Sequence, residues 1–204
     1  MNKADRVLSL ILMGLPAPSI LMLIGWWGLL PFHPADDIYY LIFASAGFIA
    51  GIALNATLLR RFMLRLFDLP FLALCALMAF YSIMLYGFFM GFPVFNIIPG
   101  ILGSYIAARS EVLHGSDRTS FQKNTRRIDM FSFILLLLLC IFTAVLTLRE
   151  PTIQSQLKSM LGLPFAVTYP MIWSTILIGG AALLALQYCF SRLAQRHVRL
   201  QHIL

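Results

Sequence analysis

Residues Tyr86 to Arg109 read YGFFMGFPVFNIIPGILGSYIAAR, and this stretch decides how the chain is organised. One apolar run ends near Gly91 and the next begins at Pro93, which leaves room only for a very tight turn. Pro99-Gly100 then interrupts the second run, because a proline removes one helix hydrogen bond and frees a carbonyl. The stretch predicts two membrane helices joined by a tight turn, with the second helix broken at Pro99-Gly100.

The composition places the whole chain in a membrane. Of its 204 residues, 60% are hydrophobic and 11% are charged, whereas soluble domains carry about 25% charged residues. A bilayer is the natural solvent for so much apolar surface. We therefore expect a single membrane domain over residues 1–204, located in the inner (cytoplasmic) membrane of the cell as a multi-pass protein.

Six apolar runs predict an all-α integral membrane protein with six transmembrane helices. The runs cover about 7–31, 38–58, 69–91, 93–108, 130–148 and 167–190, and none shows the alternation of a β-barrel strand. The fourth run is near the lower length limit for crossing about 30 Å of hydrocarbon. With both termini in the cytoplasm, every basic residue except Arg149 and Lys158 lies on the inner side. Because basic residues concentrate in cytoplasmic loops, this bias predicts that the fourth run crosses the membrane.

The segments between the runs carry further expectations. We expect residues 59–68 to lie at the membrane interface and residues 109–128 to form a polar inner loop. A short helix near 151–161 is predicted on the outer surface, with Pro151 at its start and Gly162 at its end. Asp129 follows the inner loop, where the dipole at the start of the fifth helix explains an acidic residue.

Small residues recur at helical spacing in the second and fourth runs. The two stripes are Ala44, Gly47, Gly51 and Asn55, and Asn96, Gly100, Gly103 and Ala107. Small side chains let helix backbones approach closely in a membrane. The stripes are explained either by close packing of helices or by a path that a substrate follows.

Prolines interrupt two runs that occupy equivalent positions if the protein consists of two inverted halves of three spans each. Pro16 and Pro18 interrupt the first run, as Pro99 does the fourth. Matching broken helices indicate the binding site of a transporter, and independent kinks are the alternative. The candidate ligand-binding residues are Pro16, Pro18, Tyr86, Asn96, Pro99, Gly100 and Tyr105. The candidate residues for binding anionic lipid headgroups are Arg60, Arg61, Arg126 and Arg127.

Other chemistry is not predicted. His33, Asp36 and Asp37 lie close enough in sequence to hold a divalent metal, but helix capping explains the acids. No histidine lies within an apolar run, and no hydrolase, zinc-protease or phosphate-binding motif is present. The net charge of +7 is carried by short loops, which predicts contact with anionic lipids rather than with nucleic acid. We expect no enzyme activity, no metal and no cofactor.

The hairpin also carries a family resemblance. Gly91, Pro93, Val94 and Asn96 form the pattern Gly-x-Pro-Val-x-Asn, and Gly100, Gly103, Tyr105 and Arg109 continue it as a glycine-spaced helix with a basic end. This pattern resembles the hairpin of small, uncharacterised prokaryotic polytopic membrane proteins, and the resemblance implies no activity. In size and number of spans the chain is similar to the membrane-embedded substrate-binding subunits of vitamin transporters.

Three functions follow as expectations. The leading one is binding or translocation of a neutral or amphipathic small molecule, by a transporter or a substrate-binding membrane subunit. The second is a structural or assembly subunit of a membrane complex, and the third is a membrane enzyme. The expected partners are the lipid bilayer, its anionic headgroups, and another membrane subunit or further copies of the same chain.

Overall fold

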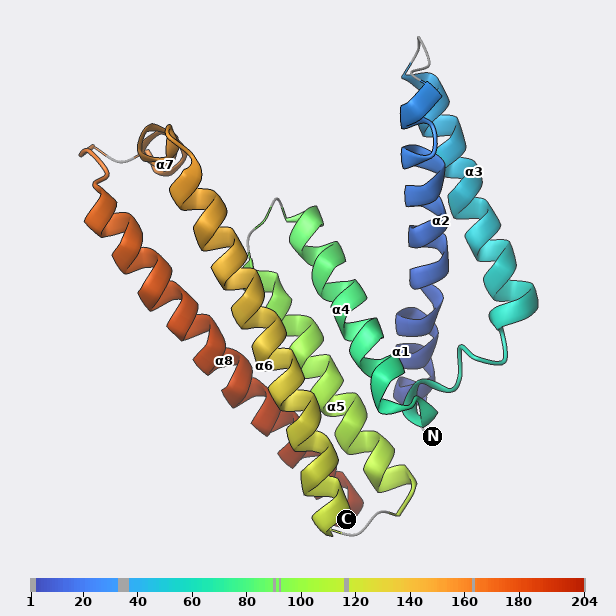
Figure 1. The fold of residues 1–204 in the computed structure, drawn as a ribbon. Helices are drawn as coiled ribbons and strands as arrows, with labels where there is room; N and C mark the ends of the chain where they lie inside the picture. The colour runs from blue at the N-terminus through green and yellow to red at the C-terminus, as the bar shows by residue number, and fades with distance from the viewer. Residues whose placement is uncertain are drawn as a thin grey trace. The chain divides into compact units, whose positions relative to one another are not determined.

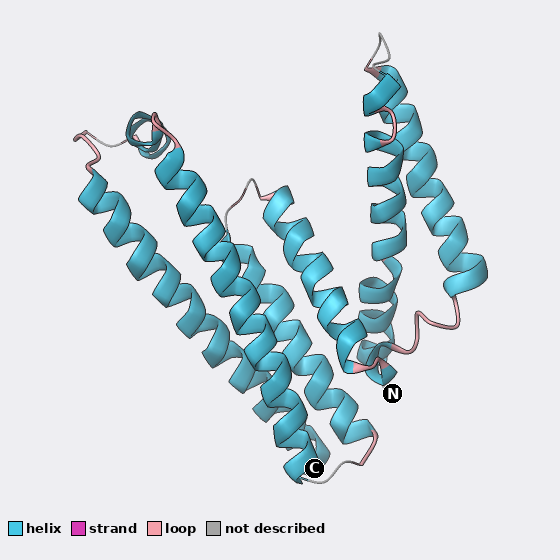
Figure 2. Cartoon of the chain, viewed as in Figure 1, coloured by secondary structure: helices cyan, strands magenta, loops and turns pink. Residues whose placement is uncertain are grey.

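The computed structural model describes residues 3–32, 37–89, 91, 93–115, 118–162 and 164–203, and all regular elements in these ranges are helices (Figures 1 and 2). The long helices are α1 (Lys3–Gly14), α2 (Pro16–Trp27), α3 (Ile38–Leu54), α4 (Phe71–Phe88), α5 (Ile97–Leu113), α6 (Arg118–Arg149), α7 (Ile153–Leu161) and α8 (Tyr169–Ile203). Short helical turns are η1 (Leu30–Phe32), η2 (Asn55–Leu59), η3 (Leu66–Asp68) and η4 (Pro93–Asn96).

Within the described ranges, five helical stretches are long and apolar enough to cross a membrane. They are Lys3–Phe32, Ile38–Leu59, Phe71–Phe88, Phe121–Arg149 and Tyr169–Leu200. The predicted class of an all-helical, membrane-embedded protein is therefore confirmed. The chain forms two compact units, Met1–Leu69 and Pro70–Leu204, and each is described by itself.

In the first unit, α2 and α3 pack directly against each other through glycines. A Cβ atom at Gly47 would lie 2.2 Å from the Leu21 carbonyl oxygen, and one at Gly51 would lie 2.3 Å from the Pro18 Cα atom. Only a residue without a side chain fits such contacts with neighbouring backbone. The small-residue stripe of the second run therefore serves close packing, as one of the two interpretations held.

The proline interruption of the first run lies between α1 and α2. The Leu15 and Ser19 amides still donate to the Ile11 and Leu15 carbonyls, each over 3.1 Å. Pro18 has no amide hydrogen, so the Gly14 carbonyl lacks its usual helix donor. The Asn55 side chain donates to this carbonyl instead. The interruption is present, but the freed carbonyl is bound within the unit.

The segment after α3, residues 59–68, is held to α1 near its end. The Ser9 hydroxyl of α1 donates to the Met63 carbonyl over 2.6 Å and accepts from the Leu66 amide over 3.4 Å. Leu66 and Phe67 are buried. Ser9 therefore holds the backbone of this part of the segment, and the two apolar side chains pack inward.

In the second unit, α5 packs against α4, α6 and α8. It runs without interruption from Ile97, so the break predicted at Pro99-Gly100 is wrong. Pro99 lies in the first turn of the helix, where backbone amides have no acceptor within the helix. A Cβ atom at Gly100 would lie 2.4 Å from the Gln187 side chain of α8. The small-residue stripe of the fourth run therefore serves helix packing. Because α5 is not broken, the proposed match between broken helices in the first and fourth runs is no longer supported.

The predicted inner loop over residues 109–128 is also wrong, because α5 continues to Leu113 and α6 begins at Arg118. The polar first part of α6 still carries a buried apolar side chain, that of Phe121. It forms a buried cluster with Ala108 of α5 and Val198 of α8. Asp129 consequently lies well inside α6 rather than at its start. By contrast, α7 confirms the short helix near 151–161, and it ends at Gly162 with a φ of 59°.

Candidate functional site

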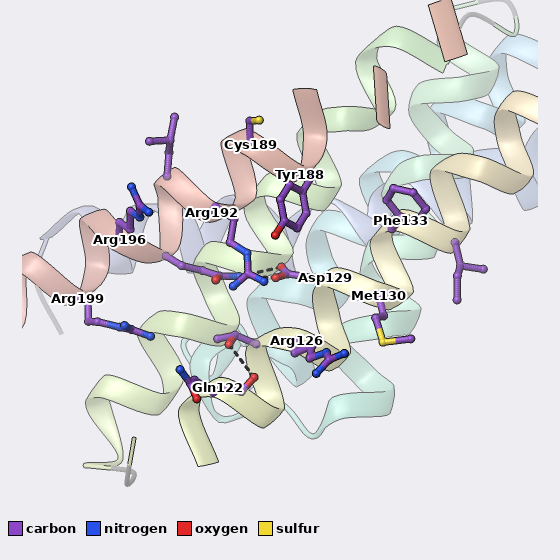
Figure 3. A pocket seen from close by; sticks show the side chains of 14 residues that line it. Gln122, Arg126, Asp129, Met130, Phe133, Tyr188, Cys189, Arg192, Arg196 and Arg199 are labelled. Atoms are coloured by element: carbon purple, nitrogen blue, oxygen red, sulfur yellow. Dashed lines mark hydrogen bonds between the residues drawn. The ribbon is translucent and has the colours of Figure 1, made fainter. Parts of the chain in front are cut away.

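A groove of about 1150 Å³ lies between α6 and α8 (Figure 3). It is lined on α6 by Gln122, Thr125, Arg126, Asp129, Met130, Phe133 and Ile134, and on α8 by Tyr188, Cys189, Arg192, Leu193, Gln195, Arg196 and Arg199. Both helices continue beyond their apolar runs, and these extensions form one end of the groove. The groove therefore spans the boundary between apolar and basic sequence.

The antiparallel course of α6 and α8 brings their basic ends together (Figure 1). Arg196 and Arg199 line this end of the groove from α8, and Arg126 lines it from α6. Arg192 lies one turn farther along α8, with its guanidinium over the Tyr188 ring. Phe133 lies about 10 Å farther along α6, because a helix rises about 1.5 Å per residue. The lining thus changes from Arg126, Arg196 and Arg199 at one end to Phe133, Ile134 and Tyr188 at the other, where Arg192 packs on Tyr188.

The carboxylate of Asp129 is held by side chains from two other helices. The Ser104 hydroxyl of α5 donates to Asp129 Oδ1 over 2.7 Å. The Gln195 amide of α8 donates to Oδ1 over 2.8 Å and to Oδ2 over 2.9 Å. Ser104 and Gln195 are buried, whereas Asp129 is partly exposed and lines the groove. These bonds fix the orientation of the carboxylate at the groove surface.

The Ser104 hydroxyl also lies 3.0 Å from the Gly100 carbonyl oxygen. A hydroxyl has one hydrogen to donate. The bond to an ionised carboxylate is shorter here and is the stronger type, because its acceptor is charged. Ser104 therefore links α5 to the groove mainly through Asp129.

The groove carries an excess of positive charge. Four arginines line it, and Asp129 is the one acidic residue of the lining. The Arg192 guanidinium lies over the Tyr188 ring, 5.2 Å from its centre, and that of Arg199 lies 4.6 Å from the centre of the Phe121 ring. Such stacking supports the guanidinium plane and leaves edge N–H groups to bind acidic oxygens. The arrangement is suited to an anionic group.

The residues predicted to bind a ligand do not line this groove. Pro16 and Pro18 belong to the first unit, where Pro18 is buried against Gly51. In the second unit, the Tyr86 hydroxyl lies 3.0 Å from that of Thr143, and Tyr105 packs on the cluster around Phe121.

The other three predicted ligand-binding residues are buried in the second unit. Pro99 and Gly100 lie in the first turn of α5. Asn96 is 3% exposed, and neither polar atom of its side chain has a hydrogen-bond partner in the part of the chain that the structure describes. We therefore place the candidate site in the groove rather than at these positions.

Of the four arginines predicted to bind headgroups, Arg126 lines the groove and Arg127 follows it on α6. Arg60 and Arg61 lie in the first unit, where they are exposed after η2. The arginines of α8 and the pair Asp129 and Gln195 were missed. The spacing of Gln187, Ser191 and Gln195, continued past the apolar run, is the signal that would have indicated a polar helix face.

The described residues include no group of three or more His, Cys, Asp or Glu side chains suited to a metal ion. His33 and Asp36 of the loop considered for a metal lie outside the described residues. Comparisons of the chain with protein-family models, curated proteins and solved structures find no match.

Proposed function

We propose that this membrane protein binds an amphipathic molecule with an acidic headgroup in the groove between α6 and α8. The observation that carries the proposal is the change of lining along one groove, from Arg126, Arg196 and Arg199 at one end to Phe133, Ile134 and Tyr188 at the other. Arg192 stacks on Tyr188 and adds a fourth positive charge to the lining. Guanidinium groups bind phosphate and carboxylate oxygens through short, charge-assisted hydrogen bonds. Apolar side chains at the far end match an acyl or prenyl chain.

The charge of the lining changes the expected ligand. A neutral molecule would leave the N–H groups of the arginines bonded to water, whereas an acidic headgroup would accept hydrogen bonds from several of them. Of the neutral and amphipathic ligands expected from the sequence, we therefore favour the amphipathic, anionic kind. The protein would act as a binding subunit or as a transporter for it.

We further propose six membrane crossings, with α5 as one of them and both termini in the cytoplasm. The apolar run of α6 begins at Met130 and that of α8 ends at Phe190, next to the groove arginines. Arginines at the ends of membrane helices favour the cytoplasmic side and its anionic lipids. In this orientation, the basic end of the groove faces the headgroups of the cytoplasmic leaflet.

An assembly subunit would present its small-residue stripes outward to a partner. In this structure, Gly47 and Gly51 pack on α2, and Gly103 packs on Met78 of α4. These stripes are used inside the two units, so this observation favours the binding function over the assembly function.

The test measures binding of an anionic lipid by the full chain in nanodiscs of phosphatidylcholine. Removing two groove charges, as in Arg192→Gln with Arg196→Gln, should weaken binding of phosphatidylglycerol about thirtyfold, since each basic residue contributes about 1 kcal/mol. The matched control is Arg149→Gln with Lys158→Gln, because both residues are exposed and lie outside the groove. Equal binding by the groove variant and the control variant would overturn the proposal.

A further inference from the structure

Asp129 is an unexpected lining residue for an anion site. Its carboxylate repels phosphate oxygens, and this repulsion lowers affinity unless the ligand brings a hydrogen-bond donor. Oδ1 accepts bonds from Ser104 and Gln195, whereas Oδ2 accepts one bond, from Gln195. A carboxylate offers about four acceptor positions, so Oδ2 retains capacity for one further donor.

The charges around Asp129 indicate which kind of donor group the ligand carries. An ammonium group would bind the carboxylate but would also meet four arginines in the same groove. A hydroxyl group donates to the carboxylate without adding positive charge. A fully ionised terminal phosphate offers acceptors to the arginines but no donor to the remaining acceptor position of Asp129 Oδ2.

We infer that the groove selects phosphate esters that carry a free hydroxyl, such as a glycerol, sugar or inositol phosphate headgroup, and that Asp129 recognises this hydroxyl. This inference rests on the proposed function and names its substrate class. The arginines bind the phosphate, and Asp129 accepts from the hydroxyl. Gln195 and Ser104 act as positioning residues, since their three hydrogen bonds hold the carboxylate in place.

The experiment compares phosphatidylglycerol with phosphatidic acid as ligands of the full chain in phosphatidylcholine nanodiscs. The wild type should prefer phosphatidylglycerol about tenfold, the usual effect of a hydrogen bond to a charged acceptor. Asp129→Asn should abolish most of this preference while phosphatidic acid binds as well as before or better. Gln195→Met keeps the length of the side chain and removes its two hydrogen bonds to Asp129, so it should reduce the preference for phosphatidylglycerol over phosphatidic acid.

The two failures are distinguishable. If the groove arginines have no effect on either lipid, then the proposed function itself fails. If Arg192→Gln weakens both lipids but the wild type binds them equally, then only the selection of a hydroxyl is overturned. Should Asp129→Asn lower thermal stability, Gln195→Met provides a second comparison, and an unchanged preference in that variant would overturn the positioning of Asp129 by Gln195.

A soluble competitor identifies the source of the headgroup. Glycerol 3-phosphate should displace phosphatidylglycerol only at far higher concentration, because it lacks the chains that contact Phe133 and Ile134. If glycerol 3-phosphate instead displaces phosphatidylglycerol at an equal concentration, and Asp129→Asn abolishes this displacement, then the groove recognises a hydroxyl-bearing phosphate and its ligand is water-soluble. Failure of glycerol 3-phosphate to compete at any concentration would count against recognition of the headgroup.

Discussion

At the scale of single residues, Asn55 stabilises the first unit by binding a carbonyl that a proline has left without a donor. Its amide donates to Gly14, whose usual partner would be the amide of residue 18. Asn55→Ala should cost about 1–3 kcal/mol, because the carbonyl then lacks a buried donor. Pro18→Ala restores an amide hydrogen at the right place, so in that background Asn55→Ala should cost less than half as much.

A double-mutant cycle, measured as thermal unfolding of the full chain in detergent, checks this coupling. Equal costs of Asn55→Ala in the two backgrounds would show that the asparagine does not compensate for the proline. Thr57→Ala serves as a control, because among the described residues the Thr57 hydroxyl bonds only within its own helical stretch, to the Ala53 and Leu54 carbonyls.

The sequence indicated the two residues behind this bond but not the bond itself. Pro18 predicted an interruption of the first run, and Asn55 was placed in the small-residue stripe of the second. The pairing depends on how α3 lies against α2, which no local pattern specifies. Asp129 was missed for a related reason, since a polar segment before it was interpreted as a loop and the acid as a helix-start residue.

At the scale of helices, the closest packing in the first unit occurs where α3 crosses α2. Gly47→Ala places a Cβ atom within 2.2 Å of the Leu21 carbonyl oxygen, so the two helices must separate. We expect a loss of about 1–3 kcal/mol, the usual cost of overpacking. Gly179→Ala on α8 is the matched control, because a Cβ atom added there would meet nothing within 4 Å, and it should be neutral or stabilising by up to about 1 kcal/mol.

Thermal unfolding of both glycine variants in the same detergent tests this difference. A Gly47→Ala protein as stable as the Gly179→Ala protein would contradict the close approach of α2 and α3. Because the two substitutions make the same chemical change within helices, any difference between them reports on the contact.

Helix positions were predicted well from apolar runs, but helix ends were not. The runs end where charged residues begin, whereas α6 and α8 continue because Phe121 and Val198 keep an apolar stripe beyond that point. Pro99 was interpreted as a break because its position relative to the first turn of α5 was unknown. Hydropathy indicates which part of a helix lies in lipid. Contacts with neighbouring helices determine how far the helix continues beyond its apolar run.

At the scale of the whole molecule, composition was sufficient for the class and insufficient for the site. The groove needs side chains from residues 122–134 and 188–199, which are far apart in the chain. Their meeting follows from the antiparallel course of two long helices, both packed on α5. Short-range patterns such as the hairpin at Gly91 therefore directed attention to residues that serve packing.

The proposed orientation can be tested by labelling single cysteines. The labelling pattern depends on whether α5 crosses the membrane. The native Cys75, Cys140 and Cys189 are first replaced by serine, and one cysteine is then introduced for Lys3, Lys123 or Lys158. If α5 crosses the membrane, an impermeant maleimide should label Lys158→Cys in intact cells and the other two only after permeabilisation. If α5 does not cross, α6 begins on the outer side, so Lys123→Cys would be labelled in intact cells while Lys3→Cys would not. That second pattern would place the groove arginines outside and would remove the cytoplasmic leaflet as the source of the ligand.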